Sequence, residues 1–533
     1  MRSEQFVELQ KLLPPLLPEF LSAQRWFGGK AHRIRGAEVL DIVPFRASQL
    51  ESFIVLARVE YETGVRESYL LPLLAWSADH EPLEEISHGM KVAVPGKDLL
   101  LGDALHNEDF LLALHAAIEA QSVLAGLNGE IRARQAKTYR DICPASAGVL
   151  RPKPMKVEQS NSSIVYGDRL VLKIFRHIQP GTNPDLEIGR FLSERARFPH
   201  VPSVAGWLEY GGNEGQSATL GILQQFVENQ GDAWRFTSDS LAEFWQRAAG
   251  RLEELSAPSP PVLFPLQRSG QSIPGPVREL CGSYLDAAAL LAQRTAQLHA
   301  ALASEASVPG FAPEPYTPQF QAAMADSLRE KTQNALALLR SHVAEMTGDT
   351  RADAGRVLKA ENEVLQSFGA ALSRPITAMR TRIHGDYHLG QVLYTGSDFV
   401  IIDFEGEPAR PMSERSAKLS PLQDVAGMLR SFHYAAFASV FATSAGQDAH
   451  SENIRQRLKV AQSWYLWVAA HFTNAYLNEA RNAPFIPASE EQLATVLRVH
   501  LLEKAVYELN YELNNRPDWV RIPLAGISSL LKS

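Results

Sequence analysis

The segment RIHGDYHLGQVLYTGSDFVIIDFEG, residues 382–406, constrains the fold of this chain more than any other stretch. It contains two strongly apolar runs, 392–394 and 399–402, on either side of the turn-forming residues 395–398. Apolar runs around a short turn of Thr, Gly, Ser and Asp are typical of a β-hairpin. The sequence therefore predicts that the chain folds back on itself here and brings the polar residues at both ends of the segment together.

Pairing Tyr394 with Phe399 in this hairpin places Gln391 and Asp403 side by side at its open end, with Asp386 just upstream. An amide oxygen next to a carboxylate suits Mg²⁺, which takes few protein ligands and keeps the rest of its shell for water and phosphates. Asp386 then remains as the group that accepts a proton from a hydroxyl. This order of base and metal ligands is that of phosphotransferases, in which Asn usually stands at the position of Gln391. The alternative is a surface hairpin with polar ends.

The composition, with 45% hydrophobic and 21% charged residues in 533, is that of a globular protein with a large core. The formal net charge of −8 argues against a nucleic acid or an anionic membrane as a partner. Two cysteines provide no disulfide framework, the N-terminus lacks a secretory pattern, and no window is apolar enough to span a membrane. We therefore expect a cytoplasmic protein.

Strand and helix signals divide the chain into three predicted domains: a β-containing module over 1–95, a β-rich lobe over 96–227 and a helical lobe over 228–533. Within them we expect a helix over 109–127, a helix that starts at Asn183-Pro184 and a Pro/Ser-rich loop over 256–276. Strands and helices that occur in separate runs indicate an α+β fold.

A second hairpin, SSIVYGDRLVLKIF, carries an isolated lysine, Lys173, in an apolar strand. With Gly167-Asp168 as a two-residue turn, Ser162 falls opposite Lys173. A lysine in such a strand is costly to desolvate unless it is paired, and Glu187 on the following helix is the expected partner. In kinases a Lys–Glu pair of this kind orients the lysine toward the nucleotide phosphates. The alternative is a solvent-exposed edge lysine and an ordinary surface glutamate.

Small residues around the start of this hairpin offer backbone N–H groups that can cover phosphates, although the glycines of the usual kinase loop are missing: Ser160, Asn161, Ser162 and Ser163. The segment ILQQFVEN fits a connector between two lobes, where the backbone at Gln225 and Val227 would bind adenine. All of these candidates come before the hairpin at 392–402 in the sequence, which is the order found in kinases.

Three motifs, HGDYHLGQ, IIDFEGEP and SPLQDVAGMLRSFHYAA, resemble those of bacterial maltokinases, which are relatives of the aminoglycoside phosphotransferases in the protein-kinase-like superfamily. The resemblance extends to the N-terminal QRWFGGK and the C-terminal EKAVYELNYELNNRPDWVRIPL, and so covers essentially the whole chain. It implies an α+β, bilobal protein-kinase-like fold with an N-terminal cap. It also implies ATP-dependent phosphorylation of maltose at its anomeric hydroxyl, with α-maltose 1-phosphate feeding bacterial glycogen synthesis.

By this resemblance Asp386 is the catalytic base, Gln391 and Asp403 bind Mg²⁺, and Lys173 contacts ATP. Glu405, two residues after Asp403, is a further candidate metal ligand. In many bacteria such kinases are fused to trehalose synthase, which makes that enzyme a candidate partner. The chain would then be a stand-alone kinase or one half of such a fusion.

Candidates for sugar binding are polar and aromatic residues of the helical lobe: His384, Arg430, Lys504 and Tyr511. Lys504 and Tyr511 lie seven residues apart, two helical turns, so both can face one cleft, with Tyr507 between them. The alternatives are that these tyrosines belong to the core and that His384 supports the catalytic loop. Asp424 is expected to cap a helix or to brace that loop.

Three alternative functions stay open. A kinase of the same fold that acts on glucosamine or an aminoglycoside differs only in its acceptor. A non-catalytic pseudokinase regulator would not need Lys173, Asp386 and Asp403, all of which are present. A protein kinase is disfavoured, because Asp-Phe-Glu replaces Asp-Phe-Gly and no activation-segment pattern follows.

Overall fold

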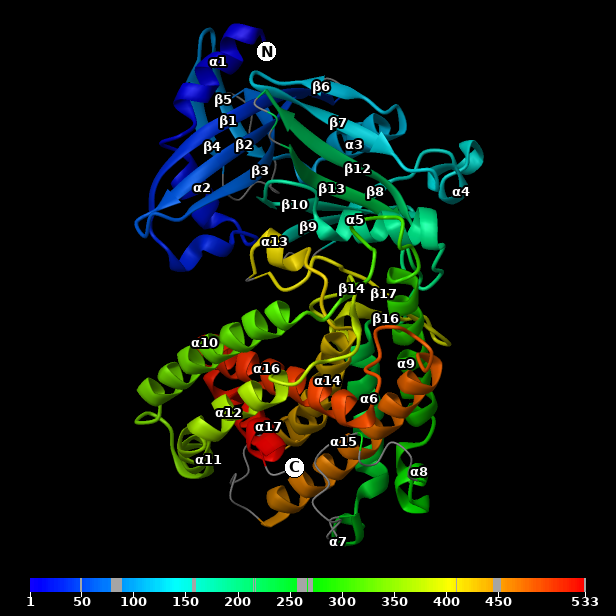
Figure 1. Cartoon of the computed structure of the whole chain (residues 1–533). Helices are drawn as coiled ribbons and strands as arrows, with labels where there is room; N and C mark the ends of the chain where they lie inside the picture. The colour runs from blue at the N-terminus through cyan, green and yellow to red at the C-terminus, as the bar shows by residue number, and fades with distance from the viewer. Residues whose placement is uncertain are drawn as a thin grey trace. The chain divides into compact units, whose positions relative to one another are not determined.

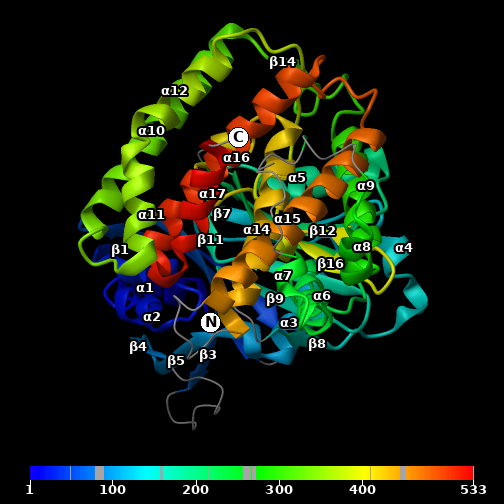
Figure 2. The ribbon, with the colours of Figure 1, turned by 90° about the horizontal axis from the view of Figure 1, so that it is seen from below.

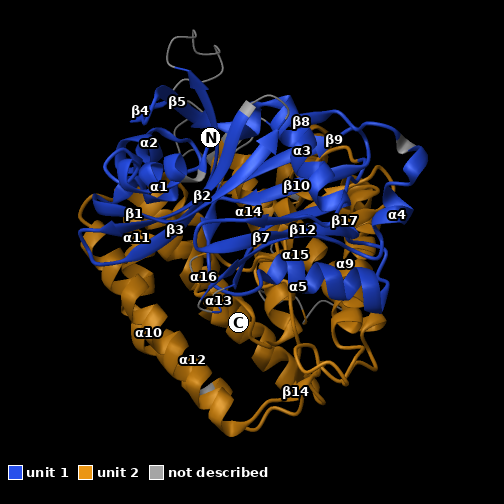
Figure 3. Cartoon of the chain, turned by 90° about the horizontal axis from the view of Figure 1, so that it is seen from above, with its two compact units in different colours: residues 1–228 blue, residues 229–533 orange. Residues whose placement is uncertain are grey.

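The computed structural model describes all residues except 48–49, 78–88, 156–159, 214, 216, 256–265, 267–271, 409, 444–451 and 532–533. Strands dominate the N-terminal part of the chain and helices the C-terminal part (Figure 1), which confirms the predicted α+β class. The chain forms two compact units, residues 1–228 and residues 229–533 (Figure 3). Most of the predicted Pro/Ser-rich loop at 256–276 lies outside the described residues.

The first sheet of unit 1 is antiparallel and has the strand order β1-β2-β3-β5-β4. Its strands are β1 (Ile34–Ala47), β2 (Leu50–Tyr61), β3 (Arg66–Ser77), β4 (Met90–Val94) and β5 (Lys97–Asp103), and β11 (His177–Ile178) pairs with β3. Because β4 and β5 form a hairpin within this sheet, the sheet continues past residue 95, where the sequence analysis ended the first domain.

The second sheet of unit 1 has seven strands in the order β6-β7-β12-β13-β10-β9-β8. They are β6 (Val123–Ala125), β7 (Gly129–Gln135), β8 (Pro152–Pro154), β9 (Asn161–Tyr166), β10 (Leu170–Phe175), β12 (Val204–Gly212) and β13 (Ser217–Gln225). The helix predicted over 109–127 is shorter: α3 spans Glu108–Glu119. Gln121 then takes a left-handed backbone conformation, with φ of 52°, and the chain enters β6.

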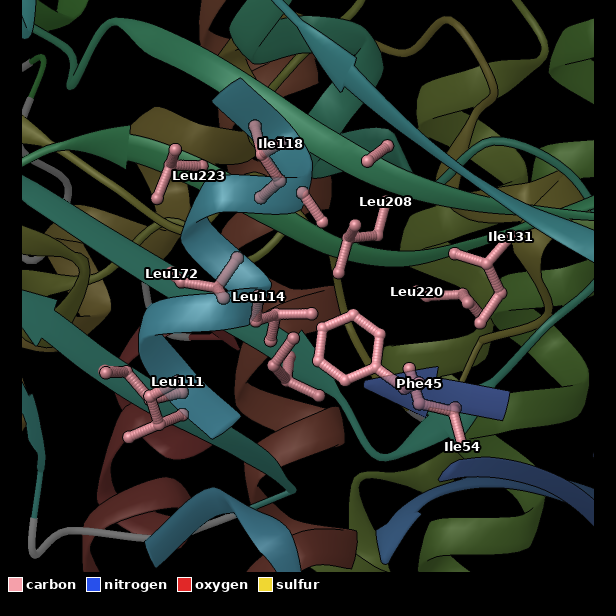
Figure 4. Packing of buried hydrophobic residues seen from close by; sticks show 14 of the residues in the cluster. Phe45, Ile54, Leu111, Leu114, Ile118, Ile131, Leu172, Leu208, Leu220 and Leu223 are labelled. Carbon is pink, nitrogen blue, oxygen red and sulfur yellow. The ribbon is translucent and has the colours of Figure 1, made fainter. Parts of the chain in front are cut away.

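The first sheet is buried on both faces, because apolar side chains from its successive positions point in opposite directions. Phe45 and Ile54 pack with α3 and the second sheet, as Figure 4 shows. On the opposite face, Phe53 and Val55 pack against α1 (Ser3–Leu12) and α2 (Leu17–Ala23). Helix α3 contributes Leu111, Leu114 and Ile118 to the shared core (Figure 4). The N-terminal module and the β-rich sheet are therefore parts of one packed unit.

Asp41 on β1 ties the two sheets of unit 1 together. Its side chain is fully buried and accepts hydrogen bonds from the backbone N–H groups of Ile42, Leu127 and Asn128 at 2.8–2.9 Å. The hydroxyl of Tyr210 on β12 donates a fourth, at 2.9 Å. The carboxylate thus gives an acceptor to three backbone N–H groups and one buried hydroxyl.

In the part of unit 2 that the structure describes, the regular elements are helices apart from two short β-ribbons. Its long helices are α6 (Ala233–Ala248), α9 (Tyr284–Leu302), α10 (Pro318–His342), α14 (Pro421–Thr443), α15 (Glu452–Glu479) and α16 (Glu490–Asn515). Shorter ones are α7 (Leu252–Leu255), α8 (Gly275–Cys281), α11 (Gly348–Lys359), α12 (Glu361–Leu372), α13 (Met412–Arg415) and α17 (Arg521–Leu531). Helix α14 packs on both α15 and α16, and α10 packs on the other side of α16 (Figure 2). Within the described ranges, none of the helices combines the length and hydropathy that a membrane span requires.

Arg430 on α14, a predicted sugar-binding residue, lies in the helix interface instead. Its guanidinium is 3% exposed and forms a forked pair with Glu508 on α16, with N–O distances of 2.5 and 2.9 Å. The adjacent Gly526 on α17 leaves space for it, since a Cβ there would lie 2.3 Å from Nη1. The structure therefore favours a structural role for Arg430, because charge buried between helices needs a partner in the same place.

Replacing Asp41 with Ala should lower the free energy of unfolding by about 3 kcal/mol, because three backbone N–H groups and one hydroxyl lose their acceptor. Differential scanning calorimetry measures the effect. Asp98→Ala, at an exposed position of β5 in the same sheet, is the control and should change the Tm little. An equal loss in both variants would contradict the assigned role.

Replacing Arg430 with Met should destabilise unit 2 by about 3–5 kcal/mol, because Glu508 is left as an unpaired buried charge. The double variant with Glu508→Leu should recover most of this loss, since two apolar side chains fill the same space without a charge. Thermal unfolding of the two variants and the wild type provides the comparison. A double variant no more stable than the single one would argue against the pair.

Candidate active site

The hairpin predicted from the first motif is present in unit 2, with the predicted register. Strands β16 (Val392–Tyr394) and β17 (Phe399–Ile401) pair Tyr394 with Phe399 and Val392 with Ile401. The N–H of Thr395 donates to the carbonyl of Asp398 at 2.9 Å, and Gly396 adopts a φ of 94° that favours glycine. The four-residue turn chemistry read from the sequence is thus confirmed.

Two contacts hold this hairpin against the helices of unit 2. Arg294 on α9 donates hydrogen bonds from Nε and Nη2 to the two carboxylate oxygens of Asp398 in the turn, at 2.9 and 2.8 Å. On the other edge, Tyr394 exchanges backbone hydrogen bonds with Gln230 and Gly231, and its ring stacks on Phe236 of α6 at 4.1 Å. A hairpin of this size is only marginally stable alone, so these contacts determine where its open end points.

Gln391 and Asp403 lie side by side at the open end, as the sequence predicted. The amide of Gln391 donates from Nε2 to Oδ2 of Asp403 at 2.7 Å. Asp403 has a left-handed backbone with φ of 68°, a strained conformation for a residue with a side chain. A carboxylate oxygen of Glu405 lies within 4.8 Å of one of Asp403. The three side chains therefore present amide and carboxylate oxygens of the kind that a hard divalent cation takes as ligands.

The loop that carries Asp386 is fixed by Asp424 near the start of α14. The buried carboxylate of Asp424 accepts the backbone N–H groups of His384 and Gly385 at 2.8 and 2.9 Å. His299 on α9 contacts the same carboxylate from Nε2 at 3.1 Å. The expectation that Asp424 braces the catalytic loop is therefore confirmed, and the brace also joins α9 to α14.

His384 links the loop to the hairpin. Its Nε2 donates to the carbonyl of Ile402 at 2.9 Å, and its Nδ1 accepts the N–H of Asp386 at 3.4 Å. The side chain is almost completely buried. With both ring nitrogens engaged, the structure favours the loop-supporting role of His384 over the predicted contact with sugar, and it couples Asp386 to the residue before Asp403.

Asp386 is paired with Lys504 of α16, with 3.2 Å between Oδ1 and Nζ, and His388 lies 3.9 Å from its other oxygen. Burial alone raises the pKa of the Asp386 carboxyl, but the Lys504 ammonium and His388 outweigh burial and hold this pKa below its usual range. The carboxylate is still 20% exposed. It is therefore an ionised group within reach of a substrate.

A pocket in unit 2 adjoins this carboxylate. Its walls include Gly385 and Tyr387, on either side of Asp386, together with Glu407 and Arg410 and the α16 residues His500, Glu503, Lys504 and Tyr507. The enclosed space is about 30 Å³, room for about two water molecules, and the rest of the hollow is open to solvent. The sequence analysis named Lys504 and Tyr507 here but missed Glu407, Arg410 and His500.

Tyr511 lies outside this pocket wall. It is 43% exposed, and its ring lies 6.5 Å from that of Tyr507. Tyr507, one turn closer to Lys504, takes the place in the pocket that the sequence assigned to Tyr511. Helical spacing identified the correct face of α16, but the pocket lining on this face ends at Tyr507, one turn before Tyr511.

In unit 1, Lys173 on β10 forms an ion pair with Asp185, with 3.1 Å between Nζ and Oδ2. Asp185 follows the predicted helix start: α5 spans Pro184–Phe191, and the side chain of Asn183 caps it by accepting the Asp185 N–H at 2.8 Å. Asp185 is thus a partner of Lys173 that the sequence pattern did not indicate, and the expected pairing with Glu187 stays a prediction. The first turn of a helix is a favourable place for a carboxylate. The Asn183-Pro184 helix start was therefore the sequence signal that could have located Asp185.

The register of the Lys173 hairpin differs from the prediction by one residue. Lys173 pairs with Ser163, not with Ser162, because three residues rather than two connect the strands. Ser162 consequently points inward, is buried, and accepts a hydrogen bond from Arg176 at 2.8 Å. Of the predicted phosphate-covering residues, the exposed Ser160 and the half-buried Asn161 and Ser163 remain accessible.

The predicted adenine contacts lie at the C-terminal end of β13. The N–H of Gln225 already donates to the carbonyl of Ser203 at 2.8 Å, so this donor is engaged within unit 1. Val227 lies just beyond the strand and is half-buried. The predicted role of the backbone at Val227 stays a prediction.

Two family models match the chain. The maltokinase N-terminal cap domain matches residues 20–106, and the phosphotransferase enzyme family matches residues 153–459, more than half of the chain. The sequence is also similar to a glucosamine kinase of Streptacidiphilus jiangxiensis, with 25% identity over 72% of this chain and 75% of the relative. A glucosamine kinase of Mycolicibacterium smegmatis is 24% identical over 77% of this chain and 88% of its own length.

Among solved structures, a glucosamine kinase in complex with glucosamine, ADP and inorganic phosphate is similar to this chain. The match has a TM-score of 0.61 and 18% identity, and it covers 96% of this chain and 99% of the other. A second crystal form of glucosamine kinase gives a TM-score of 0.60 over 97% of this chain and 99% of that one, also at 18% identity. The two structures share the fold of this chain. The chain belongs to the phosphotransferase enzyme family and carries a maltokinase-type N-terminal cap.

Proposed function

We propose that this phosphotransferase transfers a phosphoryl group from ATP to the anomeric hydroxyl of maltose, giving α-maltose 1-phosphate and ADP. The observation that carries the proposal is the pairing of Asp386 with Lys504 beside a pocket lined mostly by polar side chains. This arrangement places an ionised proton acceptor where a hydroxyl can approach it. A product of this kind would serve α-glucan synthesis in a bacterium.

The nucleotide and the metal are assigned to residues of the two units separately. In unit 1, Lys173, oriented by Asp185, is the cation for the nucleotide phosphates. In unit 2, Gln391, Asp403 and Glu405 fit Mg²⁺ by their donor chemistry, since all three offer oxygen. When bound, Mg²⁺ would neutralise charge on the β- and γ-phosphates.

The chemistry assigned to this chain's own residues is proton removal and positioning. Asp386 accepts the proton of the attacking hydroxyl, while Lys504 keeps the carboxylate ionised and directed at the pocket. Asp424 and His384 fix the loop so that the carboxylate does not need to reorganise. Rate enhancement then comes from orientation and electrostatics, without a covalent intermediate.

The charges of the pocket favour a neutral sugar. Each carboxylate of its wall is already engaged: Glu407 with Arg410, Glu503 with Arg410 and His500, and Asp424 with backbone N–H groups. An amino sugar carries an ammonium, which would need a carboxylate that is not already compensated. The model that matches the cap is named for maltokinases, but a glucosamine kinase structure matches 96% of this chain, so the cap does not distinguish the two acceptors.

Glucosamine is the second candidate acceptor. The two sequence relatives and both structural relatives described above are named glucosamine kinases, and the sequence relatives match about three quarters of this chain. The reaction type and the residues in the pocket would be the same, with transfer to a hydroxyl of the amino sugar. The two candidates differ in whether the pocket must hold a positive charge.

A coupled ADP-release assay with ATP and Mg²⁺ should give the highest kcat/KM on maltose among maltose, glucose, glucosamine and kanamycin. The matched control, Asp386→Asn, should bind ATP normally but lose turnover by orders of magnitude, because the amide cannot accept the proton. A higher kcat/KM on glucosamine than on maltose would show that glucosamine, and not maltose, is the acceptor. Near-normal turnover of Asp386→Asn would remove Asp386 from its role.

Lys504→Met should shift the acidic limb of the kcat/KM profile to higher pH. A base with a depressed pKa is ionised and active above that pKa and is lost as the pH falls through it. In the variant, burial still raises the Asp386 pKa while the largest opposing charge is gone. Lys504→Arg keeps the cation and should leave the limb near its wild-type position. Identical acidic limbs in all three proteins would contradict the assignment.

A further inference from the structure

His500 is a buried side chain in the wall of the pocket, and none of the roles assigned above uses it. It lies on α16, is 3% exposed, and contacts Oε2 of Glu503 from Nδ1 at 3.1 Å. Among the residues that the structure describes, its other ring nitrogen, Nε2, has no hydrogen-bond partner. A buried polar atom without a partner costs free energy, so one that lines a pocket points to a ligand group.

The environment of Glu503 determines which ring nitrogen of His500 carries the proton. Arg410 and Lys331 lie 3.4 and 3.6 Å from Oε1 of Glu503. Burial raises the pKa of Glu503, but the hydrogen bond and charge of His500 and these two cations outweigh it and hold the pKa at about 2. An ionised carboxylate only accepts, so Nδ1 of His500 donates to it. In the neutral ring Nε2 is then an acceptor, which suits a hydroxyl.

The helical spacing of α16 relates His500 to the reacting group. His500, Glu503, Lys504 and Tyr507 follow the spacing i, i+3, i+4 and i+7, so they form one stripe, and all four line the pocket. Lys504 contacts Asp386. His500 lies one turn away, about 6 Å along the helix axis. It is therefore positioned to meet a hydroxyl of the same sugar whose reacting hydroxyl is at Asp386.

We propose that His500 determines acceptor specificity by accepting, at Nε2, a hydrogen bond from a non-reacting hydroxyl of the sugar. The inference rests on the proposed function, since it requires a sugar acceptor beside Asp386, but it does not depend on whether that sugar is maltose. In this proposal His500 fixes the orientation of the acceptor in the pocket, although proton removal by Asp386 does not itself need His500.

The chain offers a matched control in His433 on α14. This histidine is also buried, and within the described residues its Nδ1 has no hydrogen-bond partner. Its ring stacks on Phe437 at 4.3 Å and does not line the pocket. A change at His433 therefore reproduces the removal of a buried imidazole without removing the proposed sugar contact.

The test compares His500→Phe, His500→Gln and His433→Phe by steady-state kinetics on maltose. In His500→Phe the KM for the sugar should rise about ten-fold, because the sugar hydroxyl loses its acceptor. The KM for ATP should stay unchanged. His500→Gln, whose amide oxygen can accept, should recover part of the loss, and this variant keeps the test open if the Phe variant does not fold. His433→Phe should leave both KM values unchanged.

A series of monodeoxy maltoses that keep the reacting anomeric hydroxyl then identifies the partner hydroxyl. In the wild type one analogue should lose about ten-fold more kcat/KM than the others, and in His500→Phe that difference should disappear. If glucosamine is the better acceptor, the same comparison is made with glucosamine and its deoxy analogues, so failure of maltose does not decide the inference. Equal sugar KM values in the wild type and both His500 variants would overturn it.

Discussion

The buried carboxylate of Asp424 is the interaction on which the rest of the candidate active site depends. It satisfies two consecutive backbone N–H groups of the loop before Asp386 and receives His299 from a neighbouring helix. From this anchored loop, His384 reaches the carbonyl of Ile402 and so joins the loop to the hairpin that carries Gln391 and Asp403. The proposed proton acceptor and the candidate metal-binding oxygens are thereby parts of one hydrogen-bonded structure, which would limit reorganisation during phosphoryl transfer.

Paired charges are a second principle shared by both units. Lys173 with Asp185 and Asp386 with Lys504 are the pairs with proposed roles in the reaction, whereas Arg430 with Glu508 serves packing. In every case a charge that burial would penalise has its partner on a different secondary-structure element. The cations of the first two pairs keep some exposure, 15% for Lys173 and 24% for Lys504, whereas the side chain of Arg430 is 3% exposed. A cation proposed to meet a substrate thus stays partly open to solvent, whereas the cation that serves packing does not.

The accuracy of the sequence predictions depended on how local the deciding interaction is. The register of the hairpin around 395–398 and the cap at Asn183 were predicted correctly, because turn chemistry and capping act within a few residues. The register around Gly167 was wrong by one, because a two- and a three-residue connection have similar sequences. That slip exchanged the roles of Ser162 and Ser163, since neighbours on a strand face opposite sides.

By itself the sequence determined the fold class, the order of the polar groups and the placement of Gln391 beside Asp403, because strand alternation and turn residues are local properties. Only the tertiary structure decided that Asp185 pairs with Lys173, that Arg430 is buried in a helix interface and that His500 lines the pocket. These outcomes depend on which elements pack together across long stretches of sequence. Periodicity shows that a residue lies on a given face of a helix, but packing alone decides whether that face meets a core or a pocket.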